Sequence, residues 1–199
     1  MKKLLIASNN QGKIREFKRM LGGFYDEVLS LRDAGIRADV VEDGTTFYEN
    51  ARKKALEISL MADCDVMSDD SGLCVDCLNG GPGVYSARFS GKGATDEKNN
   101  ALLVEKVSAF PENERTARYV CDLVLARAGK EILHAEGSCE GIIITEAKGE
   151  NGFGYDPYFF YPPLDKTFAE IDMDLKNTLS HRAIALEKLC AMLEEGLHE

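Results

Sequence analysis

The chain has 199 residues, of which 44% are hydrophobic and 29% charged, a composition typical of a globular protein with one substantial core. Its net charge of −10 argues against DNA or RNA as the main partner but not against a small phosphate ligand in a locally basic pocket. No apolar run reaches the ~18 residues of a membrane span, and the N-terminal run LLIA falls short of the ~7–15 apolar residues of a secretory signal. We therefore expect a single cytoplasmic domain over residues 1–199.

The first half of the sequence alternates predicted strands and helices. The apolar run at residues 3–7 predicts a buried strand, and residues 12–21 carry an apolar helical face. A second helix is expected from Thr46, because the sequence TFYE fits a capping box in which Thr46 caps the helix and Glu49 reaches back. Further expected elements are strands at residues 65–68 and 73–78, a turn at 79–83, and a helix that begins at Thr95 or Asp96 and covers 99–107.

The second half of the sequence is richer in strands. Residues 116–144 read as two or three strands with a hairpin at 128–130, and residues 148–163 read as a loop rich in glycine and aromatic residues. A final helix is expected from Ser180 to about residue 195. This order of elements predicts one α/β fold, in which helices flank a mixed central sheet and two lobes enclose a cleft.

The cysteines are more consistent with reduced thiols than with a metal or redox centre. Cys74 and Cys77 form a C-x-x-C, which could suggest zinc or redox chemistry. A zinc ribbon needs a second such pair, however, and positions i and i+3 of a strand point to opposite faces. We therefore expect free, mostly buried thiols of a cytoplasmic protein at all six positions, which are Cys64, Cys74, Cys77, Cys121, Cys139 and Cys190.

The segment ASNNQGK at residues 7–13 is a candidate anion site. It joins a predicted strand to a predicted helix, where free backbone N–H groups and the helix dipole attract negative charge. Lys13 opposes that dipole in the first helical turn, so its presence favours a compensating anion. The segment lacks the Walker A pattern, and an ordinary polar loop remains an alternative.

The segment SDDSGL places Asp69 and Asp70 side by side at the end of a predicted strand. Carboxylates in that position suit Mg²⁺, a hard cation that prefers oxygen ligands. A phosphatase that forms an aspartyl phosphate would need Asp-x-Asp, so that both acids face one way. Adjacent acids should instead diverge. We expect one of the two to face a cleft and the other to face backbone or a cation.

Two more segments carry charge near helix starts. Glu42 and Asp43 precede the helix that begins near Thr46, where acids are common simply because they suit the dipole. The same helix carries RKK at residues 52–54, which is typical of a solvated face. Ser180 reads as an N-cap that puts His181 and Arg182 in the first turn of the last helix, where cations are disfavoured unless an anionic or electron-rich group lies nearby.

The segment GFGYDPYFF at residues 152–160 could hold a flat ligand. Its glycines allow close approach of the backbone, Phe153 and Tyr155 offer stacking faces, and Asp156-Pro157 fixes a turn. A purely structural loop is an alternative. Taken together, these segments predict a binding site for a nucleoside triphosphate, with an anion loop, carboxylates, lysines, an aromatic slot and a His-Arg pair.

The ordered blocks SNNQGK, EDGTTFYENARKKA, DDSGL, GGPGVYSARFSG, GFGYDPYF and KNTLSHRA resemble the inosine triphosphate pyrophosphatase family, also called dITP/XTP or non-standard purine NTP pyrophosphatases. The match runs from Ile6 to about Leu189, and a small departure is Leu175, where relatives often carry an acid. The resemblance implies hydrolysis of ITP, dITP and XTP between the α- and β-phosphates, which removes deaminated purines from the nucleotide pool. It also implies a two-lobed α/β fold and a homodimer.

Carried over position by position, the resemblance implies a role for each matching residue. Glu42 and Asp70 would hold Mg²⁺, and Asp70 would accept the proton of the attacking water. Lys13 and Lys54 would neutralise the triphosphate. The role of Asp69 stays open, either as a support for the site or as a metal ligand through water. The expected substrate-binding residues are Ser8, Asn9, Asn10, Gln11, Gly12, Lys13, Lys54, Ser71, Phe153, Gly154, Tyr155, Asp156, Lys176, His181 and Arg182.

Two other functions fit parts of the sequence. A pyrophosphatase of the Maf type would act on modified pyrimidine nucleotides, but the SHR and GFGYDP segments favour a purine. A nucleotide-binding module without turnover would not require a water-activating acid together with Glu42 and the lysines.

Overall fold

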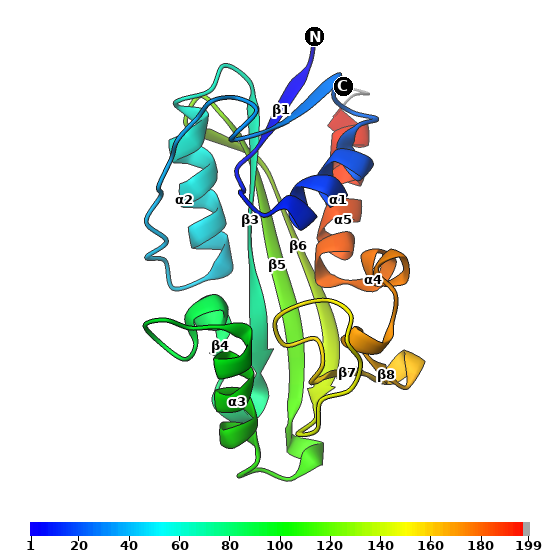
Figure 1. The fold of residues 1–199 in the computed structure, drawn as a ribbon. Helices are drawn as coiled ribbons and strands as arrows, with labels where there is room; N and C mark the ends of the chain where they lie inside the picture. Colours follow the sequence, from blue (N-terminus) through cyan, green and yellow to red (C-terminus); the bar gives the residue numbers. More distant parts are fainter. Residues whose placement is uncertain (197–199) are drawn as a thin grey trace. The chain divides into compact units, whose positions relative to one another are not determined.

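The computed structural model describes residues 1–196 and has the mixed α/β architecture expected from the sequence (Figure 1). Its helices are α1 (Gln11–Leu21), α2 (Phe47–Ser59), α3 (Asp96–Val107), α4 (Met173–Leu179) and α5 (His181–Gly196). Its strands are β1 (Lys3–Ile6), β2 (Glu27–Ser30), β3 (Asp65–Val75), β4 (Gly81–Pro82), β5 (Thr116–Arg127), β6 (Lys130–Ile143), β7 (Phe159–Tyr161) and β8 (Lys166–Thr167).

The strands form a mixed sheet in the order β2-β1-β3-β5-β6-β7-β8, with β4 paired to β3. Strand β1 runs parallel to both β2 and β3, whereas β7 is antiparallel to β6 and β8. The chain divides into two compact units: unit 1 comprises residues 1–70, 121–137 and the chain from Ile184 onward, and unit 2 comprises residues 71–120 and 138–183. Strands β3, β5 and β6 each contribute residues to both units. The expected cleft stays a prediction.

Unit 1 has helices on both faces of its strands. Leu4 and Ile6 of β1 share a buried cluster with Phe17 of α1 and Leu186 of α5. Leu5 of β1 points the other way, into a cluster that includes Ile58 of α2 and Val66 of β3. This alternation along β1 follows the period of two of a strand, and it puts α1 and α5 on one face and α2 on the other (Figure 1).

Unit 2 has a core rich in aromatic side chains. Tyr119 of β5, Phe159 of β7 and Phe168 pack together with ring centroids 4.6–5.9 Å apart. They share a cluster with Leu73 of β3 and Leu103 of α3. Rings at these distances contribute both apolar burial and favourable aromatic contacts.

Several expected elements are confirmed. The N-cap of α2 is Thr46, with Glu49 completing the capping box. The hairpin between β5 and β6 turns at Ala128 and Gly129, whose φ angles of 49° and 75° belong to the left-handed conformation that such turns require. The first helix and the helix from Asp96 are also confirmed.

The expected break in the strand around SDDSGL is wrong. Strand β3 runs without interruption through Asp69, Asp70 and Gly72, and residues 76–78 form a short 3₁₀ helix instead of continuing the strand. The two acids do not interrupt the sheet because both find polar partners, which are described below. The helices and strands that the sequence did not predict are α4, β2, β4, β7 and β8. Of these, β4 lies inside the expected turn at residues 79–83 and β7 inside the expected loop at residues 148–163.

Within residues 1–196, no helix combines the length and apolar character needed to cross a bilayer. All six cysteines fall in this part of the chain and all are free thiols. Burial raises the pKa of the thiols of Cys74 and Cys77, which leaves little reactive thiolate at neutral pH.

Candidate active site

In unit 1 the candidate site lies where the order of strands reverses. Because β1 pairs with β2 on one edge and with β3 on the other, the carboxyl ends of β1 and β3 mark a topological switch point, the usual ligand site of open α/β sheets. The backbone N–H of Ala7 still donates to Met67 O at 2.8 Å, after which the chain leaves the sheet toward α1. Strand β3 continues past this point and carries Asp69 and Asp70.

The loop after β1 is organised by its own side chains. Ser8 Oγ accepts from the backbone N–H of Asn10 at 3.1 Å, and Asn10 Oδ1 accepts from the backbone N–H of Lys13 at 3.1 Å. Helix α1 therefore starts at Gln11 with Asn10 as its cap, and its first turn carries no acid. Asn9 lines a neighbouring cavity of ≈ 590 Å³. The predicted residues 8–13 thus connect β1 to α1 and include the first turn of that helix, as a phosphate-binding loop does.

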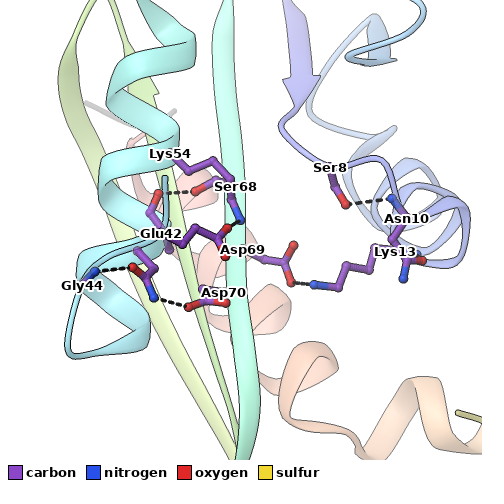
Figure 2. Close-up of polar contacts among 11 residues, drawn as sticks. Ser8, Asn10, Lys13, Glu42, Gly44, Lys54, Ser68, Asp69 and Asp70 are labelled. Atoms are coloured by element: carbon purple, nitrogen blue, oxygen red, sulfur yellow. Dashed lines mark hydrogen bonds and ion pairs between the residues drawn. The ribbon is translucent and has the colours of Figure 1, made fainter. Parts of the chain in front are cut away.

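Asp69 pairs with Lys13. The Asp69 side chain is 2% exposed and that of Lys13 is 20% exposed, and Lys13 Nζ donates to Asp69 Oδ2. Figure 2 shows the two side chains directed toward each other from β3 and α1. The pair accounts for a lysine in the first turn of a helix, because Asp69 compensates a charge that the helix dipole disfavours.

Asp70 lies on the opposite side of β3, toward α2 (Figure 2). Asn50 Nδ2 donates to Asp70 Oδ2 at 3.0 Å, and Asn50 Oδ1 in turn accepts from the backbone N–H of Gly44 at 2.8 Å. Burial, together with the negative charge of Glu42, raises the pKa of Asp70 to about 6, although the hydrogen bond from Asn50 opposes that shift. The expected divergence of the two adjacent acids is therefore observed.

Glu42 forms an ion pair with Lys54 of α2. The neighbouring lysine, Lys53, pairs with Asp43 at 2.7 Å, and Asp43 is 67% exposed. Of the basic run on α2, only Lys54 thus belongs to the candidate site, and its neighbours fit the solvated face considered from the sequence.

The carboxylates of Glu42 and Asp70 suit Mg²⁺. Among residues 1–196 no set of three or more His, Cys, Asp or Glu residues is arranged to hold a metal. Mg²⁺ is commonly bound through one or two carboxylates together with substrate phosphates, so a pair of acids is sufficient. A cation beside Asp70 would also offset the burial and the negative charge that raise the pKa of this carboxyl group.

In unit 2 the predicted residues at the start of α5 find electron-rich partners. Ser180 caps the helix, its Oγ accepting from the backbone N–H of Ala183 at 3.2 Å. The ring of His181 stacks on Tyr119, with centroids 4.9 Å apart and planes 15° apart. Arg182 Nη2 donates to Ser71 Oγ at 3.3 Å. The two basic groups thus contact an aromatic face and a hydroxyl.

The loop at residues 152–156 is held by the carboxylate of Asp156. Asp156 Oδ2 accepts from the backbone N–H of Phe153 at 2.9 Å and from Lys176 Nζ. Gly152 has a φ of +78°, and a Cβ there would lie 2.1 Å from Asp156 Oδ2, so this position requires glycine. The backbone of Gly154 is held from both sides, by Asp96 Oδ2 and by Asn100 Nδ2, at 2.9 Å each.

Of the two rings in this loop, Phe153 is the accessible one. Phe153 is 55% exposed, whereas Tyr155 is 5% exposed and its hydroxyl donates to Ser86 O at 2.6 Å. Lys176 Nζ lies 4.9 Å from the centroid of Phe153 and 5.4 Å from that of Phe168. The ammonium group of Lys176 is thus held by Asp156 and by two aromatic faces.

Comparison with known proteins supports the resemblance seen in the sequence. Residues 4–192 match the Ham1 family. The chain belongs to the Ham1 family. A dITP/XTP pyrophosphatase of Clostridium perfringens is 49% identical over 195 residues, covering 95% of this chain and 96% of that protein. The Ham1 protein of Staphylococcus aureus has a structure that matches with a TM-score of 0.89 at 40% identity, covering 98% of this chain and 100% of the other.

A third relative has a structure described as a nucleoside-triphosphatase or dITP/XTP pyrophosphatase, from Mycobacterium abscessus. It matches with a TM-score of 0.79 at 40% identity, covering 94% of this chain and 98% of the other. The expected family and fold class are therefore confirmed for this Ham1 family member.

Sequence reasoning missed three contacts of the candidate site. It left the partner of Asp69 open, and it did not single out Asn50 or Tyr119. For Asn50 a signal existed, because asparagine favours caps and turns over helix interiors, and a buried one inside an amphipathic helix indicates a specific polar partner. For Tyr119 no such signal existed, because alternation along a strand predicts only that a ring is buried.

Proposed function

We propose that this Ham1 family member hydrolyses ITP, dITP and XTP to the nucleoside monophosphate and pyrophosphate with the aid of Mg²⁺. Its role would be to remove deaminated purines from the nucleotide pool. The observation that carries the proposal is the state of Asp70, a mostly buried carboxyl group with its pKa raised to about 6, placed at the end of the β1–β3 pair. The names of the relatives, which include dITP/XTP pyrophosphatases, support the choice of substrate.

The triphosphate would bind at the loop of residues 8–13 and between the lysines. Lys13 and Lys54 each hold a carboxylate partner, Asp69 and Glu42, and the two lysine side chains are 20% and 17% exposed. Partly solvated lysines can exchange or share a partner when a multiply charged ligand arrives. Backbone N–H groups at the start of α1 would add dipolar attraction for the phosphates.

Asp70 would accept the proton of the water that attacks the α-phosphorus. A general base works best with a pKa near the working pH, and without a bound metal the pKa of Asp70 is about 6. A bound Mg²⁺ would lower that pKa and keep Asp70 ionised at neutrality. Glu42 and Asp70 would hold Mg²⁺, which when bound supplies charge neutralisation for the triphosphate. Asn50 would keep the Asp70 carboxylate oriented through its bond at 3.0 Å.

The purine would be recognised in unit 2. Phe153 offers an exposed ring for stacking, and Lys176, His181 and Arg182 are potential donors to the 6-oxo group of hypoxanthine or xanthine. The 6-amino group of adenine would leave such donors unpaired, a mismatch worth up to ~10⁴–10⁵-fold in discrimination. Gly154 and Asp156 would act by holding the loop, and Ser71 by orienting Arg182.

The resemblance also supports two finer proposals, a homodimer in solution and a location in the cytoplasm. The free state of all six cysteines agrees with a reducing compartment. Light scattering coupled to size exclusion would test the dimer, since a molar mass near 21.9 kDa would contradict it.

A single assay tests the activity. The protein is incubated with Mg²⁺ and, in separate reactions, with ITP, XTP, dITP, GTP, ATP and a modified pyrimidine triphosphate, and pyrophosphate and orthophosphate are measured separately. We expect pyrophosphate from the first three substrates and little turnover of ATP. Orthophosphate as the direct product, or equal rates on ATP and ITP, would overturn the proposal.

The same assay separates the alternatives. Preferred turnover of the modified pyrimidine would favour a Maf-type enzyme. Tight binding of ITP without release of either product would favour a nucleotide-binding module.

A further inference from the structure

We infer that Tyr119 is a positioning residue for base recognition, which holds the ring of His181 by stacking and the Asp156–Lys176 pair through its hydroxyl group. This role rests on the proposed function, because His181 and Lys176 are the two groups that Tyr119 would position and that would contact the purine. Tyr119 belongs to β5, and all four residues lie in unit 2.

The ring of Tyr119 supports His181 from one side. Their centroids are 4.9 Å apart and their planes differ by 15°, which is a stacked arrangement. Tyr119 is itself fixed by Phe168, stacked at 5.9 Å and 7°, and by Phe159, tilted at 4.6 Å. A residue in the first turn of α5 is thus aligned by a ring that has little freedom to move.

The hydroxyl of Tyr119 contacts the Asp156–Lys176 pair. It donates to Asp156 Oδ1 at 3.3 Å, while the other oxygen, Oδ2, accepts from Lys176 and from the backbone N–H of Phe153. Tyr119 and Lys176 therefore hold the two oxygens of one carboxylate, which fixes the plane of that carboxylate and the direction from which Lys176 approaches. Burial and the charge of Asp156 keep the pKa of Tyr119 well above its usual range, so the hydroxyl remains a donor at neutral pH.

A core role alone does not account for a hydroxyl at this position. Tyr119 is 8% exposed and packs in an apolar cluster, where phenylalanine would fill nearly the same volume without a polar group to satisfy. The polar group is satisfied by a residue of the candidate base-binding loop. The same side chain therefore contacts both His181 and the partner of Lys176.

The expected consequence is selective for the base. Loss of the hydroxyl should weaken the binding of ligands that carry hypoxanthine and leave the binding of ligands that consist only of phosphates unaffected. The lysines proposed to bind phosphate, Lys13 and Lys54, pair with Asp69 and Glu42, whereas the hydroxyl of Tyr119 donates to Asp156. A general loss of folding would weaken the binding of both kinds of ligand. Comparing the two therefore separates positioning from stability.

The experiment measures binding by calorimetry with two probes, inosine monophosphate and inorganic tripolyphosphate, in the presence of Mg²⁺. The variants are Tyr119→Phe, which removes only the hydroxyl, and Tyr119→Leu, which also removes the ring. Tyr25→Phe is the matched control, because Tyr25 is a buried tyrosine of unit 1 whose hydroxyl donates to an aspartate, Asp65, at 3.1 Å. Circular dichroism and thermal melting accompany each variant.

We expect Tyr119→Phe to weaken the binding of inosine monophosphate about 3- to 10-fold, because a hydrogen bond is lost. Tyr119→Leu should weaken it about 30-fold or more, because an aromatic contact is lost as well. Tripolyphosphate should bind all variants within about 2-fold of the wild type, and Tyr25→Phe should match the wild type with both probes. In turnover of ITP, Tyr119→Phe should raise KM with little change in kcat.

Inosine monophosphate affinity within 2-fold of the wild type in Tyr119→Leu would overturn the inference, as would equal losses for the two probes in Tyr119→Phe. Failure of the wild type to bind inosine monophosphate would overturn it as well. Failure of the proposed function is recognised separately, as a wild type that releases no pyrophosphate from ITP.

Discussion

The two units present lysine–carboxylate pairs in contrasting surroundings. In unit 1, Lys54 and Glu42 are 17% and 31% exposed, whereas Lys13 is 20% exposed and its partner Asp69 only 2%. In unit 2, Lys176 and Asp156 are only 8% and 3% exposed, and Lys176 also lies against the rings of Phe153 and Phe168. The Lys54–Glu42 pair is thus partly hydrated and the Lys176–Asp156 pair is enclosed, while the Lys13–Asp69 pair joins a partly hydrated lysine to a buried carboxylate.

The difference in exposure indicates different roles for the two kinds of lysine–carboxylate pair. A partly hydrated pair can exchange its partner for a phosphate at modest cost, because water and neighbouring groups solvate the released ion. An enclosed pair loses far more if one member is removed, so its members stay fixed and serve as a rigid hydrogen-bonding surface. The charges of unit 1 thus suit a flexible polyanion, and those of unit 2 suit a flat ligand with defined edges.

The largest expected effect divides the two acids of unit 1. Asp70→Asn should lower kcat for pyrophosphate release from ITP by about 10³-fold or more, since it removes the proposed base and a proposed metal ligand together. Asp69→Asn should cost about 10- to 100-fold, because it frees Lys13 without touching Asp70. Steady-state kinetics with both variants measures this, and equal losses would refute the division of labour.

A second prediction tests the contrast between the units directly. Lys176→Met should destabilise the fold by about 3 kcal/mol, because it leaves the Asp156 carboxylate buried without its cation. Lys54→Met should cost less than about 1 kcal/mol, because Glu42 can hydrate. Urea unfolding of the two variants, with m-values compared to the wild type, measures the difference. Similar costs for the two substitutions would remove the distinction between the pairs.

The third prediction concerns the effect of pH on Asp70. The pKa of Asp70 is about 6 in the folded chain against an ordinary value of 3.8, so ionisation of Asp70 opposes folding as the pH rises through this range. In EDTA, Asp70→Asn should therefore be more stable than the wild type by about 2 kcal/mol above pH 6, and the gain should vanish below pH 4. Thermal or urea unfolding at pH 4, 5, 6 and 8 tests the trend. A gain that is independent of pH would show that the carboxylate charge is not its cause.

The fold was predictable where local chemistry decides it. The capping box at Thr46 and Glu49 and the glycine-containing turn at Ala128 and Gly129 depend on neighbouring residues alone, and both are confirmed. The expected end of a strand at Ser68 was wrong, because the continuity of β3 depends on partners in α1 and α2 that are distant in sequence. The short elements β2, β4, β7, β8 and α4 were not predicted, because so few residues give no clear period.

The candidate site was predictable in its residue types and less so in its contacts. A strand end with adjacent acids indicated that Asp69 and Asp70 would diverge, and the side-chain period of two makes that inference robust. Which acid pairs with Lys13, and that Asn50 braces the other, depends on the packing of helices against the sheet. In the same way, no local pattern distinguishes Tyr119 from any other buried ring of β5.

The unbroken course of β3 has a consequence for how this motif can vary. Because successive side chains alternate between faces, inserting or deleting one residue in β3 ahead of Asp69 would turn Asp70 toward α1 and Asp69 toward α2. Such a change keeps every acid in the chain and yet exchanges their surroundings. Insertions and deletions in this segment should therefore be rarer than substitutions, because the number of residues from Asp65 to Asp70 decides which face of β3 each acid occupies.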